Sequence, residues 1–465
     1  MEIKGKKVII IGAARSGIGS ANLLSMMGAD VTITDKKKEE ELPIIDRLSP
    51  AVKKKLGDYP TMNDADLVIV SPGVPLDIRP LREAKAKGVK IIGELELAYR
   101  LIKDNGIHGL TEAEFLAITG TNGKSTTTTL VDLMLKKGGF RTILAGNIGN
   151  ALTEEIHKAI NNKSTFKYIV TEVSSFQLES IEVFRPRVAA ILNITPDHLD
   201  RYRSMDDYIS AKAAIFSRQN SSDFLVLNAD DETVMMMHES RLSSRRDSPM
   251  VILFSRNKEV KGLYSKGGTI YCHIPELSLH TDLINTGDIM IKGVHNLENA
   301  MAASAVAILS GCSIEAVTAV LRDFKGLEHR LEPVREIDGI RFINDSKGTN
   351  VGAVMKSLEG FSEPVILIAG GRDKEGDFTL LRPLVRERVK CLVLIGEARE
   401  KIKRALGDLT ETILAGTLEE AVSIARGKAD KGDVVLLSPA CASFDMFRDF
   451  EDRGRQFKDI VRRLN

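Results

Sequence analysis

The stretch Ile118-Thr119-Gly120-Thr121-Asn122-Gly123-Lys124-Ser125-Thr126 decides the organisation of this chain. An apolar run, Phe115 to Ile118, precedes it, and a run of helical character, Thr127 to Lys137, follows it. A strand, a glycine-bearing turn and a helix start, in this order, aim backbone N–H groups and the positive end of the helix dipole at one point. The sequence therefore predicts a phosphate-binding loop, in which Lys124 contacts the outer phosphates and Ser125 or Thr126 offers a hydroxyl to magnesium.

This loop is shorter than the usual phosphate-loop pattern, which places a glycine five residues before Gly123. That position is Ile118, and Gly120 is the nearest substitute, so the pattern is G-x-x-G-K-[ST]. An ordinary glycine-containing turn between a strand and a helix is the alternative. The strand, the lysine and the hydroxyls together favour the phosphate loop.

The length and charge of the chain limit the classes of protein to which it can belong. At 465 residues it is too long for one core, and the expectation is roughly three domains of about 150 residues each. Lys plus Arg number 65 and Asp plus Glu number 64, so the chain carries no net field that would attract nucleic acid or an anionic membrane. We therefore expect no nucleic-acid partner.

Four widely spaced cysteines, Cys272, Cys312, Cys391 and Cys441, form no C-x-x-C pair. This spacing predicts neither a zinc site nor a disulfide framework, and it is typical of a reducing compartment. The apolar run Val8 to Ile11 is too short for a signal peptide, and no apolar stretch approaches the length that spans a membrane. We expect a cytoplasmic protein without membrane insertion.

The first third begins with a strand, a helix and a second strand that ends at Asp35, where a dinucleotide-binding fold keeps its ribose-binding acid. The turn Gly12-Ala13-Ala14-Arg15-Ser16-Gly17 lacks the central glycine of G-x-G-x-x-G, which argues against NAD and leaves a nucleotide held in another way open. The turn Ser71-Pro72-Gly73 follows another strand, so it is a candidate ligand edge.

In the middle third, polar groups follow three predicted strands: Asn147, Glu172 and His198, the last within Asn193-Ile194-Thr195-Pro196-Asp197-His198-Leu199-Asp200. In a parallel sheet these strand ends share one edge with the phosphate loop, so Lys124, Asn147, Glu172 and His198 should converge. A carboxylate and an imidazole beside phosphates predict a magnesium site.

Three other features of this third remain open. Lys212 lies on a predicted helix, and its residue pattern alone favours a solvated helix lysine. Residues 222–290 read as strands and loops without assignable chemistry, with strands at Phe224–Asn228, Met250–Ser255 and Thr269–Ile274. The helix start at Gly293-Val294-His295-Asn296-Leu297-Glu298-Asn299 is either a cap or a nucleotide contact.

In the last third the alternation of strands and helices returns, and four polar residues follow its strands: Asp345, Lys347, Lys374 and Ser443. No His or Cys nucleophile accompanies them, which favours binding of a nucleotide and an anionic co-substrate over covalent catalysis. We predict an α/β protein of three domains: a Rossmann-like N-terminal domain over residues 1–106, a central P-loop-type ATPase-like domain over 107–326 and a Rossmann-like C-terminal domain over 327–465.

Several blocks resemble those of the ATP-dependent Mur ligases of peptidoglycan synthesis over essentially the full length. They are Gly120 to Thr126, which folylpolyglutamate synthases share, Glu172-Val173-Ser174-Ser175-Phe176-Gln177-Leu178, Asn193 to His198, and Gly293-Val294-His295-Asn296. Two further blocks resemble the D-glutamate-adding branch: Asn344-Asp345-Ser346-Lys347-Gly348-Thr349-Asn350 and Ser438-Pro439-Ala440-Cys441-Ala442-Ser443-Phe444-Asp445. The Asp-Asn-Pro-Arg block of the diaminopimelate or lysine adders is absent from the sequence.

The resemblance implies roles for individual residues. It implies catalytic roles for Lys124, Glu172, His198 and Lys212, and two Mg²⁺ ions with the ligands Ser125, Glu172, His198 and Lys212, the lysine carbamylated. This reverses the solvated reading of Lys212. ATP would contact Gly120, Thr121, Asn122, Gly123, Lys124, Ser125, Thr126, Asn299, Arg330, Asp345 and Lys347. The UDP-linked substrate would contact Arg15, Ser16, Asp35, Ser71, Gly73, Asn147, Ser174 and Gln177, and D-glutamate would contact Thr349, Lys374, Ser443 and Phe444.

The activity that the resemblance implies is ATP-dependent addition of D-glutamate to UDP-N-acetylmuramoyl-L-alanine through an acyl phosphate, by a monomer whose C-terminal domain closes over the substrates. Another Mur-type or folylpolyglutamate-type ligase is the first alternative. A nucleotide-dependent oxidoreductase, suggested by the first strand-helix-strand unit and Asp35, is the second, and it leaves the Gly120 loop unexplained.

Overall fold

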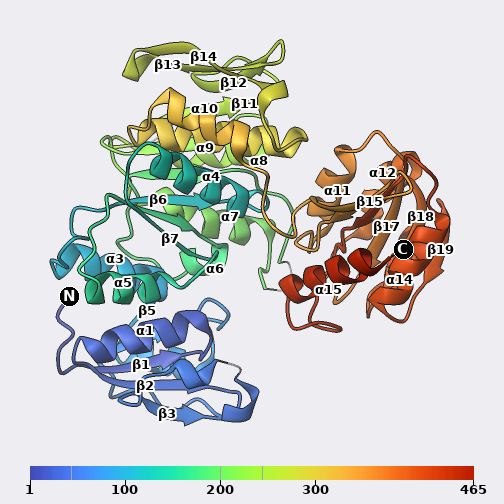
Figure 1. The fold of residues 1–465 in the computed structure, drawn as a ribbon. Helices are drawn as coiled ribbons and strands as arrows, with labels where there is room; N and C mark the ends of the chain where they lie inside the picture. The colour runs from blue at the N-terminus through green and yellow to red at the C-terminus, as the bar shows by residue number, and fades with distance from the viewer. Residues whose placement is uncertain (43, 199–200, 243–244, 465) are drawn as a thin grey trace. The chain divides into compact units, whose positions relative to one another are not determined.

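The computed structural model describes residues 1–42, 44–198, 201–242 and 245–464 (Figure 1). The chain forms two compact units, and each of its three β-sheets lies within one of them. The first unit comprises Met1–Asn193, Asp206–Asn285 and Asn299–Val320. The second comprises Ile194–Met205, Thr286–Glu298 and Leu321–Asn465. No helix among the described residues is both long and apolar enough to cross a bilayer.

The first sheet has five parallel strands in the order β3-β2-β1-β4-β5. The strand β4 is buried throughout, as expected where helices cover both faces of a parallel sheet. After β1 the chain turns through Gly12, at φ +97°, into α1 (Arg15–Met26). The Rossmann-like prediction is confirmed for this sheet. Its strands are β1 (Lys7–Ile11), β2 (Asp30–Asp35), β3 (Lys53–Leu56), β4 (Leu67–Val70) and β5 (Lys90–Gly93).

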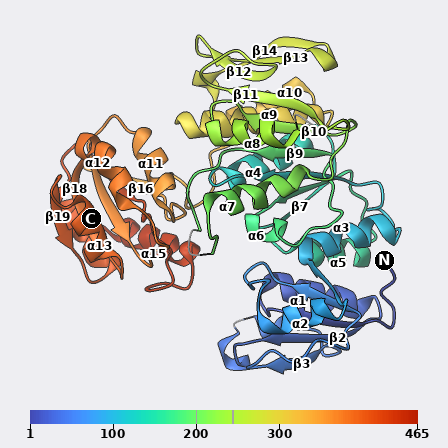
Figure 2. The same cartoon turned by 180° about the vertical axis from the view of Figure 1, so that it is seen from behind.

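The second sheet, in the same unit, has nine strands in the order β14-β13-β12-β11-β10-β9-β6-β8-β7. The strands from β7 to β12 run parallel, and β12, β13 and β14 form an antiparallel extension at one edge, at the top of the view in Figure 2. The parallel strands are β6 (Glu114–Thr119), β7 (Thr142–Gly146), β8 (Tyr168–Glu172), β9 (Val188–Ile191), β10 (Phe224–Asn228), β11 (Met250–Ser255) and β12 (Gly262–Lys266). The antiparallel ones are β13 (Thr269–Ile274) and β14 (Leu279–Asn285).

The segment 222–290 holds more regular structure than the sequence predicted. Its three predicted strands are β10, β11 and β13, but the helix α8 (Glu232–Leu242) and the strands β12 and β14 were missed. In α8 the apolar residues Val234, Met235, Met236 and Met237 are consecutive, so they lack the three-to-four-residue spacing that indicates an amphipathic helix.

The third sheet, in the second unit, has the order β15-β16-β20-β17-β18-β19, with β15 antiparallel and the rest parallel. Its core has two layers, one with Val354, Val385 and Ile402 and the other with Val422 and Phe457. This is the doubly wound architecture that was predicted. Its strands are β15 (Glu332–Ile337), β16 (Ile340–Asn344), β17 (Val365–Gly370), β18 (Val389–Ile395), β19 (Glu411–Leu414) and β20 (Val434–Leu437).

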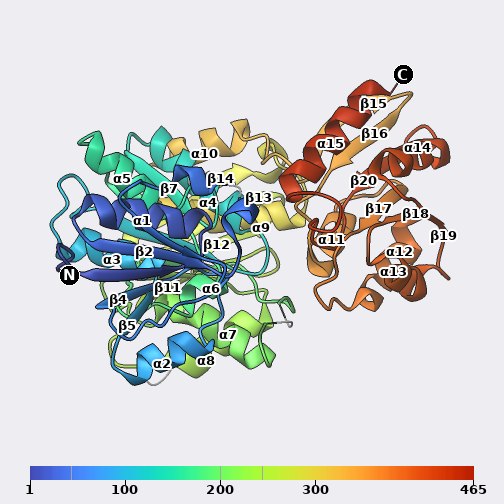
Figure 3. The ribbon, with the colours of Figure 1, turned by 90° about the horizontal axis from the view of Figure 1, so that it is seen from below.

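Besides α1, fourteen α-helices are described, among them the α8 named above. They are α2 (Arg79–Ala86), α3 (Glu94–Asp104), α4 (Lys124–Lys137), α5 (Leu152–Asn161), α6 (Ser175–Leu178), α7 (Met205–Ala213), α8 (Glu232–Leu242), α9 (Val294–Leu309), α10 (Ile314–Asp323), α11 (Val351–Glu359), α12 (Arg382–Arg388), α13 (Arg399–Leu406), α14 (Leu418–Lys428) and α15 (Phe450–Arg463). Figure 3 shows α11, α12 and α13 on one side of the third sheet and α14 and α15 on the other.

Helix α3 joins the elements of the first two sheets through two buried carboxylates. Glu94 accepts hydrogen bonds from the backbone N–H and the hydroxyl of Thr153, at the start of α5. Glu96 accepts from the backbone N–H groups of Val183 and Phe184. Because each carboxylate caps backbone donors that would otherwise be buried without partners, removing either would leave several unsatisfied groups.

Candidate functional site

The loop after β6 has the backbone shape of a phosphate cradle. Gly120 lies at φ +153° and Gly123, which precedes α4, at φ +86°, conformations that favour glycine. Asn193, after β9, holds the loop from one side: its backbone oxygen accepts from the N–H of Thr121 (2.9 Å), and its side-chain oxygen accepts from the N–H of Asn122 (2.8 Å). The predicted loop therefore forms, and Asn193, to which the sequence assigned no role, shapes it.

Asn299 lies against this loop, as predicted for an ATP-site residue. A Cβ atom added at Gly123 would stand 2.2 Å from Asn299 Oδ1, so no side chain fits between them. The hydroxyl of Thr127, on α4, donates to the same Oδ1 atom at 3.3 Å. Residues 176 positions apart in the chain, Gly123 and Asn299, thus form one surface.

Two lysines converge on the loop. Lys124 donates from Nζ to the backbone oxygens of Gly120 (2.9 Å) and Thr121 (2.8 Å), and Lys212, on α7, donates from Nζ to Gly120 O (2.9 Å). The ammonium group of Lys212 also lies 4.7 Å from the ring centroid of Tyr208. Lys212 is only 1% exposed. The reading of Lys212 as a solvated helix lysine is therefore wrong, because the turn of α7 directs it at the loop.

Glu172 and Asn147 meet at the strand ends, as predicted. The register pairs Glu172 at the end of β8 with Ile118 on β6 and Gly146 on β7. The Asn147 amide donates to Glu172 Oε1 at 2.6 Å. Among the described residues, Glu172 Oε2 and the hydroxyl of Thr126 are buried without a hydrogen-bond partner. Buried, unpartnered oxygens of a carboxylate and a hydroxyl are ligands that Mg²⁺ prefers, so the residues present fit this ion.

His198 belongs to the second unit, with the left-handed φ of +58°. Its backbone N–H donates to Asp197 Oδ1 (3.0 Å), and its Nε2 lies 3.6 Å from Asp197 Oδ2. Asn350, at the start of α11, donates to Asp197 Oδ2 at 3.0 Å. The convergence of His198 with Lys124, Asn147 and Glu172 stays a prediction. Leu199 and Asp200, quoted with the same block, lie outside the described residues.

The candidate UDP-site residues surround the turns after β1 and β4. The carboxylate of Asp35 accepts from the backbone N–H of Ala13 (2.8 Å), and the hydroxyl of Ser71 donates to Gly12 O (3.2 Å). Arg15 donates from Nη1 to Gly149 O (2.9 Å). Asp35, at the end of β2, and Ser71, after β4, thus hold the Gly12 turn in place. Ser16 lies in the first turn of α1 and Gly73 in the turn after β4.

Ser174 and Gln177 have a local role that the sequence analysis missed. The hydroxyl of Ser174 accepts from the backbone N–H of Gln177, and Gln177 Oε1 accepts from the backbone N–H of Ser174. This reciprocal pattern is a capping box at the start of α6, and its signal is Ser-x-x-Gln in the sequence.

The loops that follow β16, β17 and β20, at one edge of the third sheet, are joined by backbone hydrogen bonds. Ala440 N–H donates to Gly348 O (2.8 Å), and Gly370 N–H donates to Pro439 O (2.8 Å). Arg372 and Ala442 exchange two backbone hydrogen bonds. The strands β16, β20 and β17 are neighbours, so their carboxyl ends place at one edge the predicted residues Lys347, Thr349, Lys374, Ser443 and Phe444.

The carboxylate of Asp345 is buried in this edge. Its Oδ2 accepts from the hydroxyls of Ser438 (2.6 Å) and Ser357 (2.7 Å), and its Oδ1 accepts from Leu331 N–H (3.3 Å). Burial raises the pKa of Asp345, and these hydrogen bonds with the charge of Arg330 oppose that rise. Asp345 therefore fastens the segment that carries Arg330 to the sheet.

Arg453, which the sequence analysis missed, links two of the loops from α15. It is fully buried and donates to the backbone oxygens of Ser346 (2.8 Å) and Cys441 (3.3 Å), and from Nε to the hydroxyl of Ser346 (2.9 Å). Burial lowers its pKa to about 10. Phe450, one turn earlier, carries the ammonium of Lys347 at 4.8 Å from its ring centroid. In the sequence, Arg453 and Phe450 look like ordinary residues of an amphipathic helix, so no pattern indicated that one links the loops and the other contacts Lys347.

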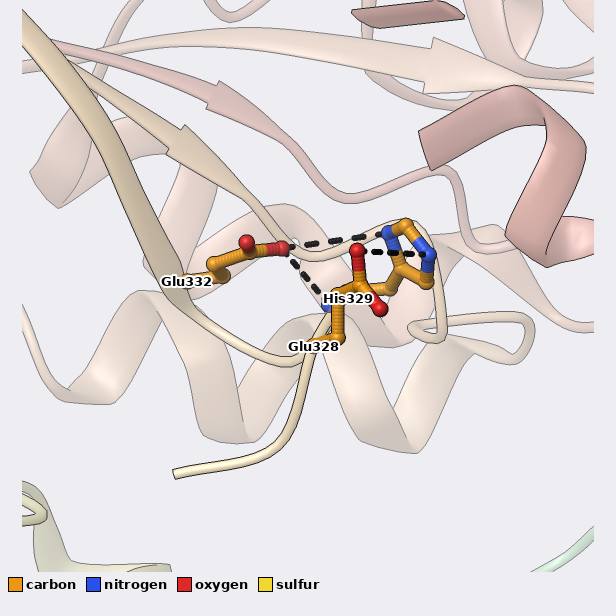
Figure 4. A group of neighbouring side chains, drawn as sticks. All are labelled: Glu328, His329 and Glu332. Carbon is orange, nitrogen blue, oxygen red and sulfur yellow. Dashed lines mark hydrogen bonds and ion pairs between the residues drawn. The ribbon is translucent and has the colours of Figure 1, made fainter. Parts of the chain in front are cut away.

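Glu328, His329 and Glu332 form a group that could hold a metal ion (Figure 4). Lys458 already supplies the cation there, since its ammonium donates to Glu328 Oε1 and to Glu332 Oε1 (3.0 Å). The hydrogen bond from Lys458 holds the pKa of Glu328 below its usual value. The Asn344 amide lies 2.9 Å from His329 Nδ1, and burial lowers the pKa of His329. This network holds His329, at φ +63°, beside Arg330.

Three buried cysteines and His295 are poorly suited to act as nucleophiles or bases. Burial raises the pKa of Cys272 and Cys312 to about 11 and of Cys441 to about 12, so these thiols carry no thiolate at neutral pH. Burial, with the charges of Arg330 and Lys356, lowers the pKa of His295 to about 4. Within the described part of the chain, His295 Nδ1 is buried without a hydrogen-bond partner.

Comparison with known proteins gives this geometry a family. Models of the Mur ligase MurD-like N-terminal domain, the Mur ligase middle domain and the Mur ligase glutamate ligase domain match residues 6–93, 118–307 and 329–441. A protein of Geotalea daltonii named UDP-N-acetylmuramoylalanine–D-glutamate ligase is 47% identical over 100% of this chain and 99% of its own length. One of the same name from Pelotomaculum thermopropionicum is 44% identical over 98% and 97%.

Solved structures agree on the fold. The UDP-N-acetylmuramate-alanine ligase of Thermotoga maritima superposes with a TM-score of 0.58 at 20% identity, covering 98% of this chain and 99% of that one. MurF of Acinetobacter baumannii gives a TM-score of 0.62 at 18% identity, covering 97% and 93%. The three-domain α/β prediction is thereby confirmed, and the chain belongs to the Mur ligase family.

Proposed function

We propose that this protein is an ATP-dependent ligase that joins D-glutamate to the L-alanyl carboxylate of UDP-N-acetylmuramoyl-L-alanine, in the cytoplasm and as a monomer. The observation that carries the proposal is the full-length similarity to proteins named for this reaction, at 42–47% identity. The geometry at the ends of β6, β7 and β8 supports it, because a phosphate cradle, the contacts of two lysines with that cradle and an unpartnered carboxylate oxygen meet there.

The first chemical step activates a carboxylate. The L-alanyl carboxylate attacks the γ-phosphorus of ATP, ADP leaves, and an acyl phosphate forms. Lys124 Nζ donates to the carbonyl oxygens of Gly120 and Thr121. When ATP binds, this ammonium group would donate to phosphate oxygens instead. The loop N–H groups and the positive end of α4 add fixed partial charges. The residues required are donors to phosphate, and no protein nucleophile enters the step.

The second step forms the amide. The amine of D-glutamate attacks the acyl carbon, a tetrahedral intermediate collapses, and phosphate leaves. We assign the D-glutamate site to Thr349, Lys374, Ser443 and Phe444, on loops that backbone hydrogen bonds and Arg453 hold at one edge of the third sheet. Asn299, Arg330, Asp345 and Lys347 would position ATP. Arg15, Ser16, Asp35, Ser71 and Gly73 would hold the UDP moiety, and Asn147, Ser174 and Gln177 the muramoyl arm.

Two Mg²⁺ ions complete the proposed site, with the ligands Ser125, Glu172, His198 and a carbamylated Lys212. When bound, the ions supply charge neutralisation at the phosphoryl oxygens. The unpartnered Glu172 Oε2 supports this assignment. Carbamylation would deprotonate the Lys212 ammonium, now 2.9 Å from Gly120 O, and form an N–C bond from its amine to CO₂, with release of the second proton. The carboxylate of the resulting carbamate is a hard ligand suited to magnesium.

One assay tests the activity and its alternatives. The protein is incubated with ATP, MgCl₂, UDP-N-acetylmuramoyl-L-alanine and D-glutamate, and ADP, phosphate and the amide product are measured. We expect product only when all four are present, and preference for D-glutamate in a panel with L-glutamate, lysine and diaminopimelate. Phosphate release that is independent of D-glutamate, or product with another amino acid, would replace the proposal with another ligase of this type.

Glu172→Gln tests the ion assignment. The amide keeps a hydrogen-bond acceptor for Asn147 and removes the negative charge, so the fold should persist while activity falls by about 10²–10³-fold. Glu179→Gln, in the turn after α6, is the matched control. Equal activity of the two variants at all magnesium concentrations would exclude Glu172 as a ligand.

A further inference from the structure

The antiparallel extension of the nine-stranded sheet carries a feature that the proposed reaction does not use. In β13 buried and partly exposed residues alternate, which puts Tyr271 and His273 on the exposed face. The strand β14 is the edge strand of the sheet, and its His280 lies directly opposite His273 in the register. Directly opposed residues in an antiparallel pair extend from the same face and have neighbouring side chains.

The two imidazole rings meet through equivalent atoms. His273 Nδ1 and His280 Nδ1 are 2.8 Å apart, and the rings are perpendicular, at 89°, with centroids 4.8 Å apart. At this distance one nitrogen donates a proton and the other accepts it, so the lone pair of one ring and the N–H of the other point into the same small space. An ion that replaces this proton would find two nitrogen ligands already adjacent.

We propose that His273 and His280 form a two-nitrogen site for a divalent transition-metal ion, Cu²⁺, Ni²⁺ or Zn²⁺. Metal–imidazole bonds of about 2.0–2.1 Å place two ligands at right angles about 2.9 Å apart, and tetrahedral ligands about 3.3 Å apart. The observed 2.8 Å is close to the right-angle value, which favours the tetragonal geometry of Cu²⁺ and Ni²⁺. Water molecules complete the coordination.

The neighbours of the pair leave this space open and add one acid. On the other side of β13, the residue opposite His273 is Gly262 of β12, which has no side chain to cover the imidazole. Asp282, two residues beyond His280, lies opposite Tyr271 and is exposed on the same face. Its carboxylate is on the same face of the sheet and can offset part of the charge of the ion.

This site differs in chemistry from the proposed magnesium site. Mg²⁺ prefers oxygen ligands, whereas two imidazoles select late transition metals. Chelation would tie β13 to β14 across the end of the sheet, so the ion should protect an edge strand that has a neighbour on one side only.

The test uses the full chain, stripped of metal with a chelator and kept free of nucleotide. We measure Ni²⁺ binding by calorimetry and the Cu²⁺ electron paramagnetic resonance spectrum for wild type, His273→Ala, His280→Ala and the control His108→Ala, an exposed histidine outside the sheet. We expect wild type and His108→Ala to bind one more ion than either pair variant, with an affinity for that ion on the order of a hundredfold higher than a single imidazole provides. Their spectra should show two coupled nitrogens.

A second readout keeps the outcome clear. Ni²⁺ should raise the midpoint of thermal unfolding of wild type and His108→Ala but not of the pair variants, while the magnesium-dependent activity of all four stays equal. The same ion stoichiometry in all four proteins, or spectra with one coupled nitrogen in wild type, would overturn the site. Loss of Mg²⁺-dependent activity in His280→Ala would show that the extension serves the main reaction instead.

Discussion

The side chains of Lys124 and Lys212 donate hydrogen bonds to the same atom, the backbone carbonyl oxygen of Gly120. The distance from Nζ to this oxygen is 2.9 Å for both lysines. Two ammonium groups that share one acceptor repel each other, and Lys212 is buried at 1% exposure, where charge repulsion is poorly screened. Conversion of one amine into a carbamate replaces this repulsion by attraction. The arrangement therefore gives a physical reason for the proposed modification of Lys212 in particular.

Lys212→Ala should be nearly inactive, because the variant lacks the proposed carboxylate ligand and leaves a cavity beside Gly120. A short carboxylic acid such as acetate should restore part of the activity by entering that cavity. Activity is followed as ADP and phosphate release. Lys158→Ala, at an exposed helix lysine paired with Glu154 and Glu155, is the control and should remain fully active. Full activity of Lys212→Ala would exclude the carbamate.

Gly123→Ala and Gly139→Ala form a matched pair. Both glycines lie at φ +86°, so an alanine strains the backbone equally, by about 1 kcal/mol. The new Cβ at position 123 would stand 2.2 Å from Asn299 Oδ1, whereas at position 139 it meets no atom within 4 Å. We expect Gly123→Ala to lose ATP binding, measured by calorimetry, and Gly139→Ala to keep it. Equal ATP affinities would mean that the loop adapts and that the contact with Asn299 is unimportant.

Arg453→Lys should weaken the binding of two substrates, ATP and D-glutamate. Lysine cannot reach the Ser346 and Cys441 carbonyls together. The loop of Ser346, proposed to contact ATP, and the loop of Cys441, proposed to contact D-glutamate, should therefore separate. We expect raised KM for both ATP and D-glutamate, an unchanged KM for the UDP substrate, and a loss of about 1–3 kcal/mol in unfolding free energy, because buried carbonyls lose a donor. The control is Arg455→Lys, half-exposed on the same helix. A general fall in kcat without these KM changes would contradict the positioning role.

Protonation of His295 should lower the free energy of unfolding of the protein at acid pH. Its folded pKa of about 4 lies below the ordinary value of about 6.5, so between these pH values the unfolded chain binds a proton that the folded chain does not. Stability is therefore unaffected above about pH 6.5 and declines as the pH falls towards 4, by roughly 2–3 kcal/mol for this group.

The measurement for His295 is the unfolding midpoint against pH for wild type and His295→Gln. The difference between the two should shift in favour of the glutamine variant as the pH falls from 6.5 to 4, because glutamine does not titrate. The charged groups that lower this pKa, Arg330 and Lys356, stay in both proteins. His108→Gln, at an exposed position, should follow wild type throughout, and parallel curves for His295→Gln would refute the assignment.

The predictions from sequence succeeded where a local pattern carries its own physical cause. The glycines of the Gly120 loop take the positive φ values that the motif requires, and the ordering of strands placed Glu172 and Asn147 at one edge, 2.6 Å apart. The proposed residues around ATP, the UDP substrate and D-glutamate remain predictions, as do the boundaries at residues 106 and 326 and the closure of the C-terminal domain.

What failed depended on contacts between distant segments. Lys212 sits in a helix whose own pattern favours solvent, and only packing against Gly120 and Tyr208 buries it. Arg453 looks like one more charge on an amphipathic helix, and His273 and His280 look like isolated histidines. Local sequence determined the phosphate loop, most strands of the three sheets and the strand-end loops, because glycine conformation and hydrophobic periodicity act over a few residues. Tertiary structure alone decided which side chains lose water and meet, because burial and charge pairing depend on residues far apart in the chain.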